Sequence, residues 1–171
     1  MKQVFKNRFI KSYLFRSADE QSRFIQNLGI VKALWLDDSI GENYLCYVCR
    51  DSLTRKVLFC ISFCTESQED DLSVIYWHES SLMAIETGKR VYLVNEDLFI
   101  INSMDVTSPI VGFLITNTNN LLIMEETSVT LVDFEGKLLM EELFDLIEDF
   151  DLNGSTLTIK TAGETEVLRL R

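Results

Sequence analysis

The segment NLLIMEETSVTLVDFEGKLLM, residues 120–140, decides the fold class of this chain. It contains two short apolar runs rich in leucine, isoleucine and valine, and a third run begins at its end. The polar letters EETS separate the first run from the second, and DFEGK separates the second from the third. Short apolar runs joined by polar turns are typical of antiparallel strands in a meander. The segment therefore predicts three consecutive strands.

Two other segments repeat this pattern weakly. SLMAIETGKRVYLVNEDLFII (81–101) has the same order of runs and turns, and STLTIKTAGETEVLRLR (155–171) has its first two strands. The segments begin about 35 to 40 residues apart, a spacing close to that of propeller blades. A chain of 171 residues without a Trp-Asp signature is too short for an ordinary closed propeller. We predict a mainly β fold of antiparallel meanders, arranged as a propeller-like open array or as two packed sheets, with repeats from about residue 81.

The N-terminal half adds one helix and further strands. Residues 2–16 alternate aromatic, aliphatic and basic side chains and predict one or two strands. Ser17-Ala-Asp-Glu20 is a capping box, and Gly29 supplies a left-handed stop, so a helix is expected near 18–28. Additional strands are predicted at Ile30–Leu36, Tyr44–Arg50, Val57–Cys64 and Leu72–Trp77.

The stretch LLMEELFDLIEDFDL, residues 138–152, fits two periodicities. A helix would place one apolar face opposite one acidic face. A strand would place four apolar side chains inward: Phe144, Leu146, Phe150 and Leu152. In the strand, Glu148 is the one residue that does not fit the alternation. The repeat pattern favours the strand, and both interpretations expose Asp145 and Asp149.

The charge is strongly asymmetric. The net charge is −11; residues 1–32 carry seven basic and two acidic side chains, or +5, which leaves −16 for residues 33–171. Ten acids lie between 125 and 151, against one lysine. A field of this sign repels nucleic acid and anionic membranes and attracts basic proteins. We therefore expect a single domain, 1–171, with a basic strand-helix segment (1–32) and an acidic meander region (33–171).

Four cysteines form a CxxC pair at Cys46 and Cys49 and a second pair at Cys60 and Cys64. Zinc sites need four thiolates that converge on one point. On a strand, however, the odd spacing of Cys46 and Cys49 would direct them to opposite faces. We therefore expect buried, reduced thiols and predict no metal site.

Two further motifs are weak. Asp149-x-Asp151-x-Asn153-Gly154 matches the opening of a calcium loop, but Lys160 occupies the twelfth position, where a glutamate is needed. Asn-Gly between two strands is also a strong hairpin signal, which we favour. His78 is the lone histidine, and no nucleophile motif accompanies it. The chain is expected to be neither an enzyme nor a cofactor protein.

The small size, the acidity and the missing catalytic set make the chain similar to bacterial immunity proteins that neutralise polymorphic or contact-dependent toxins. The resemblance implies a cytoplasmic protein that covers a basic nuclease-type toxin with an acidic surface. No nucleic acid or membrane partner is expected. The residues predicted to bind the partner are Glu141, Glu142, Asp145, Glu148, Asp149 and Asp151. Two alternatives remain open: a propeller-like scaffold that binds through strand edges, and a metal-dependent hydrolase.

Overall fold

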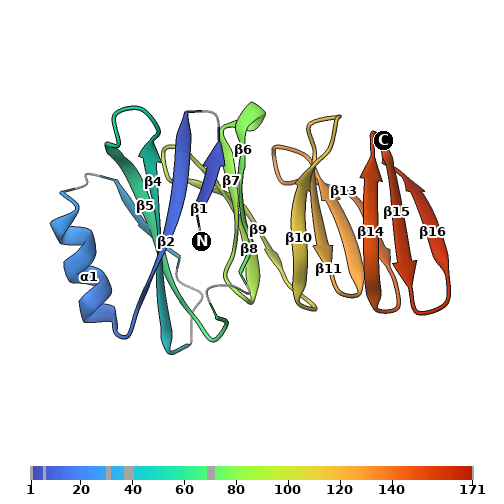
Figure 1. Cartoon of the computed structure of the whole chain (residues 1–171), viewed down its shortest axis with the longest axis horizontal. Helices are drawn as coiled ribbons and strands as arrows, with labels where there is room; N and C mark the ends of the chain where they lie inside the picture. Colours follow the sequence, from blue (N-terminus) through green and yellow to red (C-terminus); the bar gives the residue numbers. More distant parts are fainter. Residues whose placement is uncertain (1, 6, 30–31, 37–40, 69–71, 171) are drawn as a thin grey trace.

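Four β-sheets lie side by side along the long axis of the molecule, and a helix packs beside the first of them (Figure 1). The computed structural model describes residues 2–5, 7–29, 32–36, 41–68 and 72–170. The sheets, here called A to D, follow one another in chain order. The fold is mainly β with antiparallel-rich sheets and an N-terminal helix, as the sequence predicts.

Sheet A has the strand order β1-β2-β4-β5-β3. Its strands are β1 (Lys2–Phe5), β2 (Arg8–Phe15), β3 (Ala33–Trp35), β4 (Asn43–Asp51) and β5 (Val57–Thr65). All its pairs are antiparallel except β3 with β5, which run parallel. Strand β3 is shorter than the predicted Ile30–Leu36; residues 30 and 31 lie outside the described residues.

Sheets B, C and D are meanders in which neighbouring strands follow one another in sequence. Sheet B contains β6 (Val74–Trp77), β7 (Leu82–Glu86), β8 (Arg90–Asn95) and β9 (Ile100–Asp105), with a short 3-10 turn, η2 (His78–Ser80), after β6. Sheet C contains β10 (Ile110–Ile115), β11 (Leu121–Glu125), β12 (Ser128–Val132) and β13 (Leu138–Leu143). Sheet D contains β14 (Ile147–Asn153), β15 (Thr156–Thr161) and β16 (Thr165–Arg169). Successive meanders, here two of four strands and one of three, resemble the blades of a propeller. Of the two arrangements left open, the structure has the open array.

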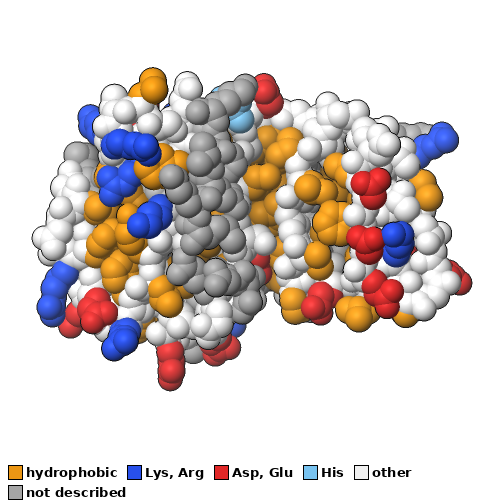
Figure 2. Space-filling view, in the orientation of Figure 1, with side chains coloured by type: hydrophobic (Ala, Val, Ile, Leu, Met, Phe, Trp, Pro, Cys, Tyr) orange, Lys and Arg blue, Asp and Glu red, His pale blue; other side chains and the backbone are white. Residues whose placement is uncertain are grey.

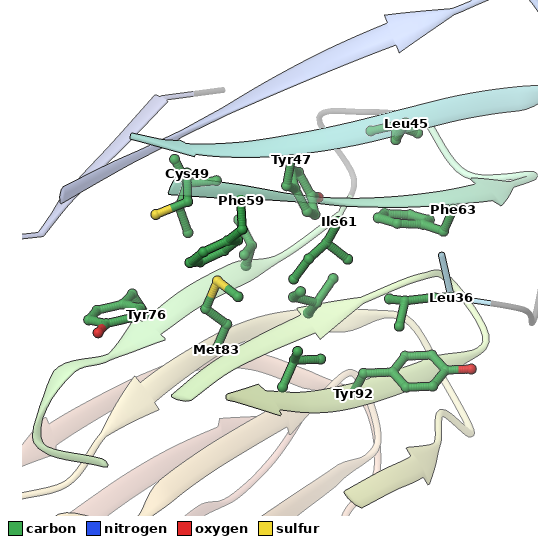
Figure 3. Close-up of a cluster of buried hydrophobic side chains, with 14 of the residues drawn as sticks. Leu36, Leu45, Tyr47, Cys49, Phe59, Ile61, Phe63, Tyr76, Met83 and Tyr92 are labelled. Carbon is green, nitrogen blue, oxygen red and sulfur yellow. The ribbon is translucent and has the colours of Figure 1, made fainter. Parts of the chain in front are cut away.

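The hydrophobic core is divided into layers between successive sheets. Figure 3 shows the layer between A and B, where Tyr47 and Phe63 of sheet A face Met83 and Tyr92 of sheet B. A second layer, around Trp77, joins B to C, and a third joins C to D. The layers explain why the run LLIM is continuously apolar. Its residues alternate between the two layers on either side of sheet C, and a strand covered on both faces needs apolar side chains at every position.

Helix α1 (Ala18–Asn27) forms as predicted and covers the face of sheet A that points away from sheet B. Ser17 is its N-cap, with extended backbone, and its hydroxyl accepts a hydrogen bond from the Glu20 amide at 3.2 Å. The Glu20 carboxylate reaches back to the amide of Arg16, one residue before the cap. Gly29 ends the helix with φ +62°. The sequence-based expectation for this element is therefore confirmed.

The ambiguous stretch 138–152 consists of strands β13 and β14. Phe144, Phe150 and Leu152 pack inward as the strand interpretation requires, but Leu146 is 53% exposed, and Ile147 is buried in its place. The register shifts between Ile147 and Asp149, so Glu148 is the extra residue of a β-bulge. A bulge inserts one unpaired residue and interrupts the alternation. This is the physical reason for the misfit at Glu148 and for the wrong assignment of Leu146.

The turns that precede β9 and β13 have matching hydrogen bonds. The Asn95 side chain accepts hydrogen bonds from the amides two and four residues later, at 3.0 and 2.9 Å, and Asp133 does the same at 2.9 Å in both cases. The third residue after each of them has a positive φ: +67° at Leu98 and +77° at Gly136. The two turns are therefore equivalent elements of adjacent sheets.

Candidate functional site

The six acidic residues predicted to bind a partner are all exposed. We call the part of the chain that carries them, residues 141–151, the acidic segment. It crosses from the edge strand of sheet C to the first strand of sheet D. Asp145 lies in the connection between β13 and β14, and Glu148 projects from the bulge. The structure thus confirms that these side chains are accessible, but it distributes them over more than one face.

On β13, Glu141 and Glu142 lie on opposite faces of sheet C. Glu141 is paired with Thr130 of β12, on the side of the sheet that faces B. Glu142 is paired with Val129, whose side chain belongs to the layer between C and D. Residues paired across antiparallel strands share a face, so these two carboxylates point in opposite directions.

On β14, Asp149 and Asp151 lie on the outer face of sheet D. Their partners across the strand pair are Lys160 and Thr158, which alternate with the inward-facing Leu157 and Ile159. Lys160 donates to Asp149 at 2.7 Å. This bond and the lysine charge hold the pKa of the Asp149 carboxyl below its usual range and raise the pKa of Lys160. The outer face of sheet D is therefore polar and partly neutralised.

The positions of Asp149 and Asp151 also show which structure the calcium-like motif adopts. Both lie within β14, and Gly154, with φ +64°, lies in the turn that joins β14 to β15. Asn153 and Thr156 are paired, so the two residues at the tip of the turn are Gly154 and Ser155. The motif is a hairpin, as favoured from the sequence, with its turn one residue later than Asn153-Gly154.

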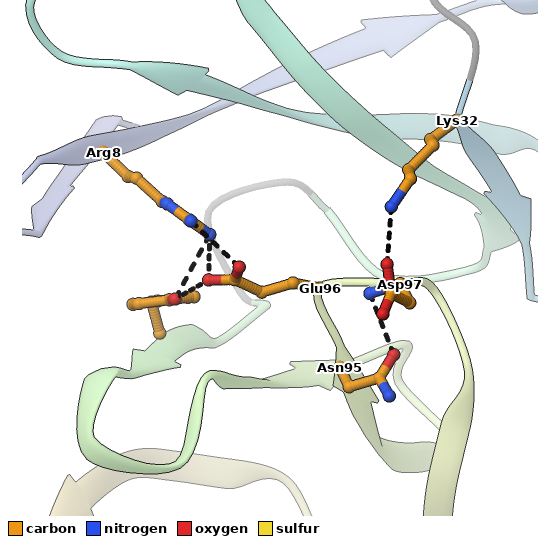
Figure 4. A network of polar contacts seen from close by, with 6 residues as sticks. Arg8, Lys32, Asn95, Glu96 and Asp97 are labelled. Atoms are coloured by element: carbon orange, nitrogen blue, oxygen red, sulfur yellow. Dashed lines mark hydrogen bonds and ion pairs between the residues drawn. The ribbon is translucent and has the colours of Figure 1, made fainter.

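The basic groups of the N-terminal part meet acids of sheet B. Arg8 donates to both carboxylate oxygens of Glu96, at 2.9 Å for the Nη2–Oε2 pair, and Lys32 donates to Asp97 at 2.6 Å (Figure 4). The Tyr76 hydroxyl also donates to Glu96, and burial together with this bond raises its pKa to about 12. Figure 2 shows the uneven distribution of charge on this face of the molecule: blue side chains gather over the N-terminal sheet, and red ones predominate over sheet D.

The cysteines are free thiols on both faces of sheet A. Cys46 and Cys60 pack under helix α1, whereas Cys49 belongs to the layer between A and B. Burial raises the pKa of Cys49 to about 12, so its thiol stays protonated. His78 is exposed at the end of β6, with its ring 6.1 Å from the ring of Tyr76. Within the described ranges, no group of three or more His, Cys, Asp or Glu side chains is placed to hold a metal ion.

A cleft opens between sheets B and C beside strands β9 and β13. Its volume is about 240 Å³. Its walls combine polar groups with apolar side chains, among them Val91, Met104, Ile123 and Val132. Two of the three carboxylates that line it are Glu141 of the acidic segment and Glu125 at the end of β11. Asp105 also borders the cleft, but its carboxylate is paired with Arg90 at 2.6 Å.

Glu125 is a buried acidic residue of this cleft that the sequence-based predictions did not include. It is only 6% exposed, and its Oε2 atom accepts hydrogen bonds from the amides of Thr107 and Ser108 at 2.8 and 2.7 Å. Glu86 of sheet B is also buried and accepts from the Ser73 amide at 2.8 Å. The sequence does contain a signal for Glu125, since an acid stands at the end of an otherwise apolar strand. A carboxylate buried at such a position needs hydrogen-bond donors nearby.

No family model matches this chain, and no curated protein matches it at a significant level. In the described part of the chain, no helix is both long enough and apolar enough to cross a bilayer. What the protein does must therefore be inferred from its own surfaces and its cleft.

Proposed function

We propose that this protein is a non-enzymatic protein-binding domain whose partner is a basic protein. The observation that carries the proposal is the state of the acidic segment. All six of its predicted binding residues are exposed, and only one of the six, Asp149, forms a salt bridge with a described residue. Exposed carboxylates without internal counter-charges attract a basic surface and increase the rate of its encounter.

The version of this function that we propose is an immunity protein acting on a nuclease-type toxin. A nuclease presents a basic surface to the phosphates of its substrate, and electrostatic contacts supply much of its affinity. A protein that places carboxylates on this surface competes with the substrate by charge and by steric occlusion. The acidic segment supports this mechanism because its side chains project from an edge strand, a connection and the outer face of sheet D.

One observation favours a second candidate, a scaffold that binds through strand edges. The edge strands β9 and β13 expose large apolar side chains: Ile100, Ile101, Leu138 and Leu139, each between 42% and 52% exposed. Phe99 and Phe134, in the turns that precede these strands, are more exposed still. Exposed apolar side chains on neighbouring edges are typical of interaction sites.

The test is a pull-down from a lysate of the source organism, washed at low and at high salt, followed by purification of the captured protein. The proposal requires a stoichiometric basic protein that high salt releases, because screening weakens contacts between exposed charges. The purified partner should cut nucleic acid, and this protein should inhibit the cutting.

The other outcomes are equally informative. A stoichiometric partner that stays bound at high salt would favour the scaffold, since apolar contacts are not screened. A basic partner without nuclease activity would retain the binding domain but exclude the proposed toxin class.

A further inference from the structure

The cleft between sheets B and C has the size of one side chain. Small-molecule sites occupy roughly 300 to 1,000 Å³. The volume of this cleft is about 240 Å³, below that range. Its occupant is therefore expected to be a single anchoring group that projects from a larger partner.

The walls of the cleft follow from the strand register. Ile123, Thr130 and Glu141 are paired in one row across β11, β12 and β13, on the face that points towards sheet B. Leu121, Val132 and Leu138 form the next row on the same face. Met104 of sheet B lines the opposite side. An entering group would thus contact apolar walls and meet a carboxylate at the exposed end of the first row.

Two of the three carboxylates of the cleft, Glu125 and Glu141, have unused acceptor capacity. The hydrogen bonds that Glu125 accepts from residues 107 and 108 all go to Oε2, and none of them uses Oε1. Glu141 is exposed and makes no salt bridge within the described part of the chain. One buried and one exposed carboxylate in the lining favour a cation over a neutral or anionic group.

We propose that the cleft receives an arginine side chain of the basic partner; this inference rests on the proposed function and deepens it. The aliphatic stem of arginine packs against apolar walls while its head remains polar. Its planar guanidinium has five donors for carboxylate acceptors, and it is less strongly hydrated than the ammonium of lysine. Arginine is also enriched among the residues that dominate the energy of protein interfaces.

The probe for this test is N-acetyl-arginine methylamide, titrated into the full chain labelled with 15N and followed by amide NMR. Saturable shifts are expected at Thr130, Gly136 and Glu141. The neutral citrulline analogue, which has nearly the same shape, should cause none. The lysine analogue should bind at least about fivefold more weakly, about 1 kcal/mol.

Two variants locate the site. Glu141→Gln removes one charge at an exposed position and should weaken probe binding about tenfold, the loss expected for one charge-assisted contact. The matched control, Glu166→Gln, removes an exposed charge from β16 and should leave probe binding unchanged. Thr130→Leu fills the cleft without altering charge and should abolish the saturable shifts, provided that the variant retains a dispersed native spectrum.

Several outcomes would overturn the arginine site. These are shifts that do not saturate, equal binding of the citrulline or lysine analogue, or unchanged binding by Glu141→Gln. The proposed function fails separately. If a basic toxin is captured and inhibited equally well by Thr130→Leu, the cleft inference is wrong and the immunity function stands. If the probe binds as expected but no basic protein is captured, the immunity function is wrong and the arginine site in the cleft stands.

Discussion

At the residue scale, Glu125 is a charged residue whose hydrogen bonds hold a connecting segment in place. Its carboxylate lies between two sheets and satisfies the amides of the segment that leads from sheet B into sheet C. A buried charge without donors would be strongly unfavourable, so these hydrogen bonds and the position of residues 107 and 108 depend on each other.

We predict that Glu125→Gln lowers the free energy of unfolding by about 1 to 3 kcal/mol, because it replaces charge-assisted hydrogen bonds with weaker neutral ones. Urea denaturation measures the change. Glu126→Gln, at the neighbouring half-buried position, is the control and should change the free energy by less than about 0.5 kcal/mol. Equal effects of the two variants would mean that the Thr107 and Ser108 contacts contribute little.

Asp149 and Lys160 provide a second prediction at this scale. The pKa of Asp149 is depressed in the folded protein, so its contribution to stability is present above the ordinary aspartate pKa and is lost as the pH falls through the folded value. A 13C carboxyl titration should place the pKa of Asp149 below the ordinary aspartate value. In Lys160→Met its pKa should return towards the ordinary range; an unchanged titration would exclude the ion pair in solution.

At the scale of the element, helix α1 and most strands were predictable because they depend on local chemistry. Ser17 and Gly29 define the helix, and the apolar runs define the strands. The parallel pairing of β3 with β5 was not predictable, since it joins segments separated by β4. The bulge at Glu148 left a sign in the sequence, a broken alternation, without revealing its cause.

Of the candidate site, the exposed acids were predictable from the local sequence and the cleft was not. Exposure of Asp145 and Asp149 follows from either the helix or the strand periodicity of residues 138–152, whereas the cleft needs two sheets to be placed together. Gly136 shows how close this approach is. An added Cβ atom there would lie 2.5 Å from Cβ of Asn102 in sheet B, and no pattern within one segment contains this contact.

The acidic segment gives a prediction about association. Reversal of two exposed charges in Asp145→Lys/Asp149→Lys should slow association with the basic partner by about tenfold or more at low salt, without unfolding the domain. Stopped-flow mixing at several salt concentrations measures the rate. The control is Glu42→Lys/Glu66→Lys, which makes the same change of charge at exposed positions at the other end of the molecule. Association unaffected by the first pair would assign the segment to solubility alone.

The contacts between sheet A and the β8–β9 turn give a further prediction, which concerns stability. The side chains of Arg8 and Glu96 are 27% and 32% exposed, whereas Lys32 and Asp97 are 49% and 70% exposed. Arg8→Met should therefore cost about 1 to 2 kcal/mol, because it leaves Glu96 partly buried without its partner. Lys32→Met should cost less than about 1 kcal/mol. Thermal denaturation in low salt compares them, and the opposite order would contradict the assigned burial.

At the scale of the whole molecule, the core between the sheets consists of apolar layers, each shared by two neighbouring sheets. In stacked arrays each unit contacts only its neighbours. The protection of backbone amides from hydrogen exchange therefore differs between units, and between the interior and edge strands of one unit. We predict slow hydrogen exchange for amides of the interior strands β8 and β12, such as Leu93 and Leu131. Amides of the edge strands β9 and β13 should exchange faster. Uniform protection would indicate a single cooperative unit.

The order of the sheets along the chain also affects biosynthesis. Sheets B, C and D are each built from one uninterrupted stretch, and each packs on the sheet completed just before it. Domains fold progressively from the N-terminus while the ribosome is still adding residues. During synthesis, each newly completed sheet therefore presents an apolar face to its surroundings until the following sheet emerges. Sheet D ends this exposure, because its outer face carries Asp149, Thr158 and Lys160.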